Sequence, residues 1–168
     1  MHRNNAIWFA YLAGKYRQGY GMDILELGAA EDTGIIRRLF RKARSYVGVD
    51  VVKHENVDLV MPAEQTVFVP GSFNYLISSS LFEHTPNWRE IIKHNQQWLG
   101  GRHGRAFFSF GAEGNVYHPP DPWAIVPVHE FLEYVQQIGF VAVECFFEDD
   151  RYGAECPGAV VVELETAT

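Results

Sequence analysis

A turn rich in small residues and acids is the segment of this sequence best suited to binding a ligand. It spans residues 24–34 (ILELGAAEDTG) and grows out of a short apolar stretch, residues 22–27, that we predict to be a strand. The small residues Gly28, Ala29 and Ala30 let a ligand approach the backbone closely. A predicted helix follows, and its N-terminus adds partial positive charge. The turn therefore predicts a ligand site where a strand passes into a helix.

The acids in this turn restrict the ligand. Glu31 and Asp32 would lie beside a pyrophosphate and repel it, and the residues from Gly28 to Gly34 do not fit G-x-G-x-x-G. A G-x-x-x-x-G-K-[ST] phosphate loop is absent from the chain. We therefore expect a ligand with cationic groups. A nicotinamide-dependent oxidoreductase is disfavoured, although tight binding of a nicotinamide dinucleotide would revive it.

Further polar residues stand at the ends of other predicted strands. Asp50 ends the second strand, Ser45–Asp50, and Ser78 and Ser79 stand at the end of the fourth, residues 73–78. In a parallel sheet the carboxyl ends of the strands share one edge, and ligands bind there.

The elements that must position these residues alternate between strand-like and helix-like stretches. This order predicts an α/β fold, a three-layer sandwich with a seven-stranded and mostly parallel sheet. No helix separates the last two strands, so we expect that pair to be antiparallel. The basic residues of 37–44 would lie on the solvent face and at the carboxyl end of the helix that begins at Thr33. The predicted helices are 6–16, 33–44, 86–99 and 128–138, and the predicted strands are 22–27, 45–50, 57–60, 73–78, 105–110, 140–147 and 159–164.

Composition limits the class of protein. The chain has 168 residues, 47% of them hydrophobic, and a formal net charge of -7, which suits one globular domain over 1–168 with a helical lead-in at 1–20. The acidic balance disfavours a nucleic-acid partner. No targeting pattern or membrane-spanning run is visible, so we expect a cytoplasmic protein with no membrane association, in which Cys145 and Cys156 are free thiols. The seven histidines lack metal-ligand spacing, and we predict no catalytic metal.

Several of these features together resemble the class I S-adenosylmethionine-dependent methyltransferases. Glu26-Leu27-Gly28 with its turn is similar to their first motif, and Asp50 stands where they place the acid for the ribose hydroxyls. Residues 71–84 (GSFNYLISSSLFEH) resemble their D-G-S-F-D-x-V-x-S-x-x-x-L-E-H region. Trp98-Leu99-Gly100-Gly101 is similar to L-x-P-G-G, and residues 118–127 resemble a proline-rich loop of one subgroup. The resemblance covers about residues 20–165.

The resemblance implies that S-adenosylmethionine is the cofactor and assigns roles around it. The turn would line its methionine part, Glu26 would orient the turn or meet the ammonium, and Asp50 would bind the ribose. The adenine would lie against Val51 and near Ala63. The implied cofactor-binding residues are Glu26, Gly28, Ala29, Ala30, Asp50, Val51, Pro62, Ala63, Ser78 and Ser79.

Two positions depart from the family pattern. Ala30 stands where a second glycine is common, and Pro62 stands where an acid often meets the adenine amino group. Glu64 could substitute for that acid. The first departure raises the question whether the backbone at Ala30 needs an angle that alanine disfavours.

The resemblance implies in-line methyl transfer to a small-molecule or sugar-type acceptor. His84 and His118 are the candidate catalytic bases for an oxygen or nitrogen acceptor, and either histidine could instead have a structural role. The alternative is a non-catalytic methyltransferase-fold domain that acts as a binding or partner module. The four tryptophans and twelve phenylalanines are compatible with a homo-oligomer in which some of them are buried between copies of the chain.

Overall fold

The computed structural model of the chain describes residues 3–30, 34–100, 104–110, 127–146 and 158–164. The helices are α1 (Arg3–Lys15), α2 (Ile35–Leu39), α3 (Trp88–Trp98) and α4 (Val128–Gln137), with short 3-10 turns η1 (Arg17–Gly19), η2 (Ala63–Gln65) and η3 (Phe82–His84). The strands are β1 (Asp23–Leu27), β2 (Ser45–Asp50), β3 (Leu59–Val60), β4 (Tyr75–Ser79), β5 (Arg105–Phe110), β6 (Phe140–Phe146) and β7 (Gly158–Leu164).

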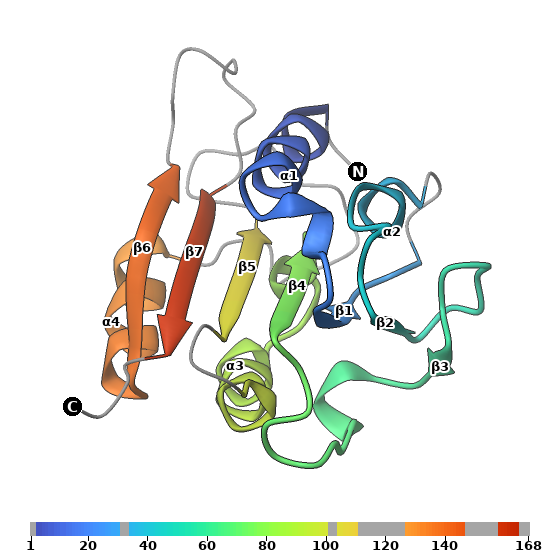
Figure 1. Cartoon of the computed structure of the whole chain (residues 1–168). Coiled ribbons are helices and arrows are strands. Elements are labelled where there is room, and N and C mark those ends of the chain that lie inside the picture. The colour runs from blue at the N-terminus through green and yellow to red at the C-terminus, as the bar shows by residue number, and fades with distance from the viewer. Residues whose placement is uncertain (1–2, 31–33, 101–103, 111–126, 147–157, 165–168) are drawn as a thin grey trace.

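The strands form one sheet in the order β3-β2-β1-β4-β5-β7-β6 (Figure 1). The first five of these strands pair in parallel, and β7 runs antiparallel to both β5 and β6. The predicted α/β architecture with a mostly parallel sheet is therefore confirmed. Because β1 to β5 all point the same way, the turns after β1, β2 and β4 meet at one edge of the sheet.

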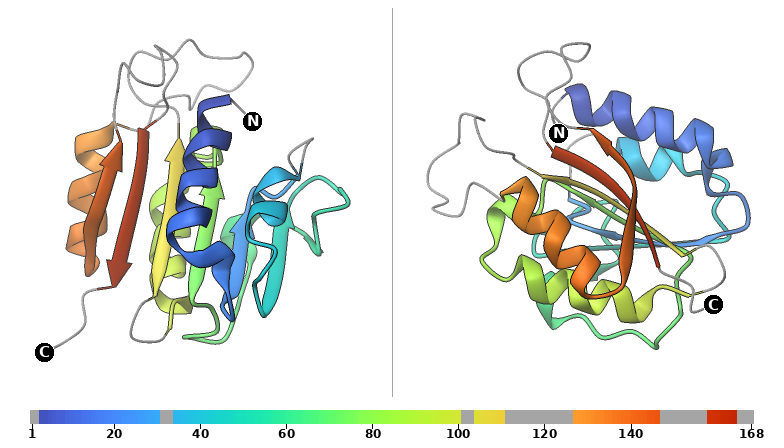
Figure 2. Two further views of the ribbon diagram at one scale, coloured as in Figure 1. Left: turned by 45° about the horizontal axis from the view of Figure 1, so that its top comes forward. Right: turned by 90° about the vertical axis from the view of Figure 1, so that its left-hand side faces the viewer.

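Helices cover both faces of the sheet (Figure 2). On the face covered by α1 and α2, Phe9 of α1 and Phe40, which directly follows α2, are buried in one core with Phe107 of β5. On the other face, Ile91 of α3 and Phe131 of α4 are buried in a second core with Phe108 of β5. Successive strand residues point to opposite faces, so one strand serves both cores. Each fully buried phenylalanine contributes about 1.5–3 kcal/mol, which keeps the strand ends in fixed positions.

The N-terminal helix α1 lies along its face of the sheet, and its last turn is attached to β6. Glu144 of β6 forms an ion pair with Lys15. Its carboxylate also accepts hydrogen bonds from the Tyr11 hydroxyl at 3.3 Å and from the Tyr16 hydroxyl at 3.4 Å. The predicted helix at 6–16 is confirmed, although α1 begins three residues earlier. Because α1 contacts both β6 and the central strands, it belongs to the helical layer on this face of the sheet.

The prediction for the helix after the first turn was wrong in its length. α2 ends at Leu39, so the basic residues that follow lie outside the helix. The reason is that the backbone turns there to pair with the segment before β1. The Lys42 amide donates to Gln18, and the Arg44 amide donates to Met22, at 3.2 and 2.8 Å. The third strand is also shorter than predicted, because only Leu59–Val60 pairs with β2.

Hydropathy along the described helices gives no membrane span. None of them is both long enough and apolar enough to cross a bilayer.

Candidate functional site

The turn after β1 folds back against the end of β2. Gly28 has a φ of +81°, which glycine adopts freely and other residues rarely do. The Gly28 and Ala29 amides both donate to the Val49 carbonyl, at 2.9 and 3.1 Å. A Cβ at Gly28 would lie 3.4 Å from Cβ of Leu81, which follows β4. The turn is therefore a close approach of three strand ends, and glycine is required by its backbone angle.

Asp50 closes this turn at the carboxyl end of β2. Its Oδ2 accepts from the Ala30 amide at 3.0 Å, and its Oδ1 accepts from the Val52 amide at 2.9 Å. Ala30 is not among the residues with positive φ, so its backbone needs no glycine. The departure at Ala30 is thus compatible with the turn. A carboxylate has about four acceptor positions, so two of them remain for donors beyond these amides.

Glu26 lies beneath the turn, on the face of the sheet that α2 covers. It is buried, with 2% exposure, and its Oε2 accepts from the Tyr46 hydroxyl at 2.7 Å. The Arg37 guanidinium lies over the Tyr46 ring, 5.1 Å from its centre, and pairs with Asp58 at 3.0 Å. This network fixes the Glu26 carboxylate under the turn.

The residues expected around the adenine lie together past the ends of β2 and β3. The Met61 amide donates to the Asp50 carbonyl at 2.8 Å, so Pro62 and Ala63 follow directly beside Asp50. Val51 is 63% exposed, whereas Ala63 is buried at the start of η2. An exposed valine next to a strand-end acid is an apolar surface that a planar ring can cover.

Glu64, the candidate substitute for the acid missing at Pro62, has a partner elsewhere. Its Oε1 accepts from the Asn87 side-chain amide at 3.4 Å, next to the start of α3. Pro62 itself has extended backbone angles and precedes η2.

The two serines at the end of β4 differ in exposure. Ser78 is fully buried, and its hydroxyl has no hydrogen-bond partner among the described residues. Ser79 is partly exposed, and its Oγ lies 3.4 Å from Ser109 Oγ of β5. Of the pair, Ser79 is therefore the one that lines the edge of the sheet.

The candidate bases and metal ligands complete the picture. His84 is exposed at the end of η3, and its amide donates to the Leu81 carbonyl at 2.9 Å. His118 lies outside the described residues, as does the rest of the proline-rich loop. Within the described ranges no three His, Cys, Asp or Glu side chains come together in a way that could hold a metal ion.

Sequence reasoning missed the polar contacts made by the N-terminal helix. Asn5 is 1% exposed and donates to Ser80 Oγ at 2.8 Å, directly after β4. Ser80 has a φ of +52°, an angle that a serine seldom adopts. No local pattern signals this contact, because its partner is 75 positions away along the chain.

Solved structures share this arrangement over almost the whole chain. The 1,6-didemethyltoxoflavin-N1-methyltransferase of Burkholderia thailandensis, with bound 1,6-didemethyltoxoflavin and S-adenosylhomocysteine, superposes with a TM-score of 0.70 at 16% identity, covering 98% of this chain and 80% of its own. An S-adenosylmethionine-dependent methyltransferase from Mesorhizobium loti gives 0.70 at 15% identity, covering 94% and 97%. This chain has the class I methyltransferase fold.

The methyltransferase fold alone does not fix the reaction. The [4+2]-cyclase SpnF has a TM-score of 0.75 to this chain at 11% identity, covering 96% of this chain and 81% of its own. No family model matches the chain, and no curated protein is significantly similar in sequence. Function must therefore be argued from the residues at the sheet edge.

Proposed function

We propose that this protein binds S-adenosylmethionine at the carboxyl edge of β1, β2 and β4 and transfers its methyl group to a small molecule. The observation that carries the proposal is the hydrogen bond between the Asp50 carboxylate and the turn that begins at Gly28. A carboxylate at the end of β2 lies 3.0 Å from the Ala30 amide, beside a glycine whose positive φ brings the backbone to the edge. This arrangement offers acceptors for ribose hydroxyls next to a turn free of side-chain bulk.

The residues present fit this cofactor better than a dinucleotide. Asp50 and the buried Glu26 make the region around the turn acidic, which favours an ammonium and a sulfonium over a pyrophosphate. The exposed side chain of Val51 offers an apolar contact for the adenine. When bound, S-adenosylmethionine supplies an electrophilic methyl group.

The chain then has to orient an acceptor and exclude water, because the methyl group is already activated. Ser79 lines the edge nearest β5 and is the described side chain best placed to orient a polar acceptor. A base is needed only where the acceptor loses a proton before or during transfer. His84 and His118 stay candidates for that role, His84 as an exposed residue just past the end of β4.

A small-molecule or sugar-type acceptor suits the charge of the chain. A net charge of -7 repels a polyanion, and the bound 1,6-didemethyltoxoflavin of the Burkholderia enzyme supports a small acceptor. We expect the protein to work in the cytoplasm as one domain, and the proposal holds for a monomer and for a homo-oligomer alike.

A second candidate is a cofactor-binding module without transferase activity. The structural likeness to SpnF, which is named for a cyclisation, supports keeping it, because the fold occurs in a protein named for a reaction other than methyl transfer. Both candidates share the same cofactor site and differ only in whether a methyl group is transferred.

Two measurements test the proposal in sequence. Isothermal titration calorimetry with S-adenosylhomocysteine should show one binding site per chain, and NADH should give no heat. A panel of small acceptors with methyl-labelled S-adenosylmethionine should then yield labelled product. Absence of binding at millimolar S-adenosylhomocysteine would refute the methyltransferase. Binding without labelled product from any acceptor would favour the non-catalytic module.

A further inference from the structure

One buried amide joins the N-terminal helix to the edge of the sheet where the candidate site lies. The Asn5 Nδ2 atom lies 2.8 Å from Ser80 Oγ and 3.4 Å from Ser79 Oγ. Asn5 is 1% exposed, and a buried amide is stable only where it is hydrogen-bonded. The two serines are therefore the groups that satisfy Asn5 in this position, and the contact fixes their hydroxyls in return.

The segment that Asn5 holds is strained. Ser80 has a φ of +52°, and its amide donates to the Ser109 carbonyl of β5 at 2.8 Å. A serine stays in this region of backbone conformation only where its surroundings hold it there. Ser80 is held by the Ser109 carbonyl through its backbone and by Asn5 through its side chain.

This strained segment is the neighbour of the Gly28 turn. A Cβ built on Gly28 would lie 3.4 Å from Leu81 Cβ and 3.7 Å from the Ser79 carbonyl oxygen. The backbone of residues 79–81 therefore forms the wall that faces the turn. A shift of a few tenths of an ångström in this wall changes the space beside Gly28.

The helix that carries Asn5 is well placed to act as a fixed support. α1 lies along the strands, and its first turn lies at the edge where β4 and β5 end (Figure 2). Its last turn is tied to β6 by the pair between Lys15 and Glu144. Phe9 and Leu12 of α1 are fully buried against the sheet, so the packing of the helix, more than the partly exposed Lys15 pair, fixes Asn5 relative to residues 79–81.

We infer that Asn5 is a positioning residue for the cofactor site: by hydrogen bonding to Ser79 and Ser80 it holds residues 79–81 in the shape that admits the cofactor beside Gly28. The inference rests on the proposed function, since it concerns the same site. It assigns to the N-terminal helix a part in cofactor binding, through a residue that does not itself touch the cofactor.

The test compares S-adenosylhomocysteine affinity among three variants, measured by calorimetry below their melting temperatures. Asn5→Ala should raise the dissociation constant about tenfold, the effect of losing one good hydrogen bond. Asn5→Ala combined with Ser80→Gly should recover most of the affinity, because glycine adopts a positive φ without support. Lys15→Ala cuts the other attachment of α1 and should leave the affinity within about twofold of wild type.

The outcomes separate this inference from the proposed function. If the wild-type chain binds and Asn5→Ala binds equally well, Asn5 has only a stabilising role and the inference is wrong. Equal losses in Asn5→Ala and Lys15→Ala, with no recovery by Ser80→Gly, would also overturn it. If Asn5→Ala does not fold, Ser80→Ala removes the same hydrogen bond from the other side and should weaken binding similarly. A wild-type chain that does not bind would refute the proposed function and this inference with it.

Discussion

Replacing Asp50 by asparagine should weaken cofactor binding strongly while leaving the fold intact. The two carboxylate oxygens now accept from the Ala30 and Val52 amides at 3.0 and 2.9 Å. Asparagine offers one acceptor oxygen in place of two, and its NH₂ group would face one of these backbone amides. The substitution also removes the negative charge that ribose hydroxyls would use. Loss of one charge-assisted hydrogen bond, about 1.5–3 kcal/mol, raises the dissociation constant by about 10–150-fold.

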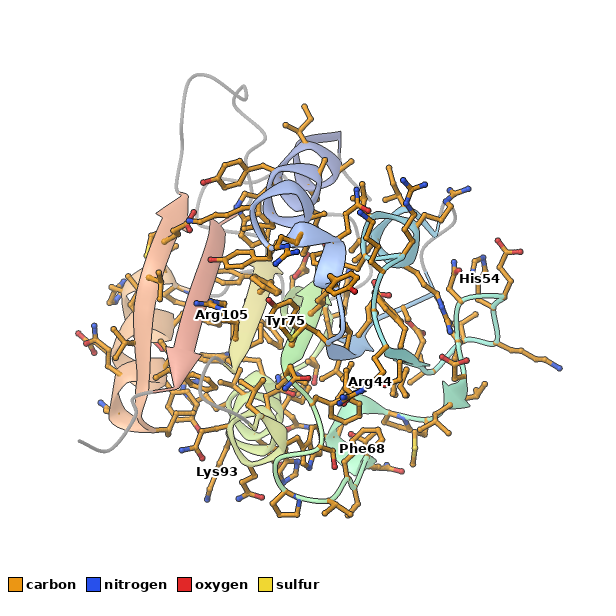
Figure 3. All side chains as sticks on the ribbon, in the orientation of Figure 1. Arg44, His54, Phe68, Tyr75, Lys93 and Arg105 are labelled. Atoms are coloured by element: carbon orange, nitrogen blue, oxygen red, sulfur yellow. The ribbon has the colours of Figure 1, made fainter. Side chains whose placement is uncertain are left out.

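A matched control exists at the opposite edge of the sheet. Asp23 begins β1, and its carboxylate is held by the Arg44 guanidinium and, at 2.7 Å, by the Ser45 hydroxyl. Arg44, labelled in Figure 3, directly precedes β2 and so lies at the end of that strand opposite the candidate site. Asp23→Asn should therefore leave S-adenosylhomocysteine affinity within about twofold of wild type. Calorimetry of both variants tests the assignment, and equal affinity of Asp50→Asn and wild type would refute it.

Three further predictions concern stability and reactivity. Gly48→Ala would place a Cβ 2.1 Å from a backbone oxygen of the β2–β3 connection, so it should lower the melting temperature by about 2–12 °C in calorimetry, whereas Gly14→Ala, with nothing within 4 Å, should not lower it. Hydrogen bonding to Arg44 lowers the pKa of Asp23, so ionised Asp23 stabilises the fold at pH values above its ordinary pKa and loses this effect as the pH falls through the lowered value. Asp23→Asn should therefore make the acid denaturation curve, followed by circular dichroism, less steep between about pH 5 and 2. An unchanged curve would contradict this. Burial raises the pKa of the Cys145 thiol. In the Cys156→Ser variant, the alkylation rate of Cys145 should therefore reach half of its maximum at a higher pH than that of an unperturbed cysteine thiol. A lower midpoint would contradict the structure.

Local patterns were sufficient to predict most of the sheet. The strands Ser45–Asp50 and Arg105–Phe110 have the predicted bounds, because each is a short run of strand-forming residues between clear breaks. The antiparallel pairing of the last two strands followed from the lack of a helix between them. β6 also contains an irregularity between Ala142 and Glu144, which alternation alone does not reveal.

Tertiary contacts decided the features that the sequence could not predict. The helix after Gly34 ends early because the residues beyond Leu39 pair with the segment before β1, a contact between chain positions about 20 apart. The placement of Asp50 beside the turn was predicted from its position at a strand end and its resemblance to a family pattern. The bond from Asn5 to Ser80 was not, since it depends on how α1 packs across the finished sheet.

The measurement that tests the central claim most directly is a crystal structure of the chain grown with S-adenosylhomocysteine. We expect the ligand at the carboxyl edge of β1, β2 and β4, with its ribose hydroxyls on Asp50 and its methionine part against Gly28 and Ala29. The Ser79–Leu81 wall should keep the position it has here. Ligand bound elsewhere on the chain, or a crystal grown at millimolar ligand with none at this edge, would contradict the account.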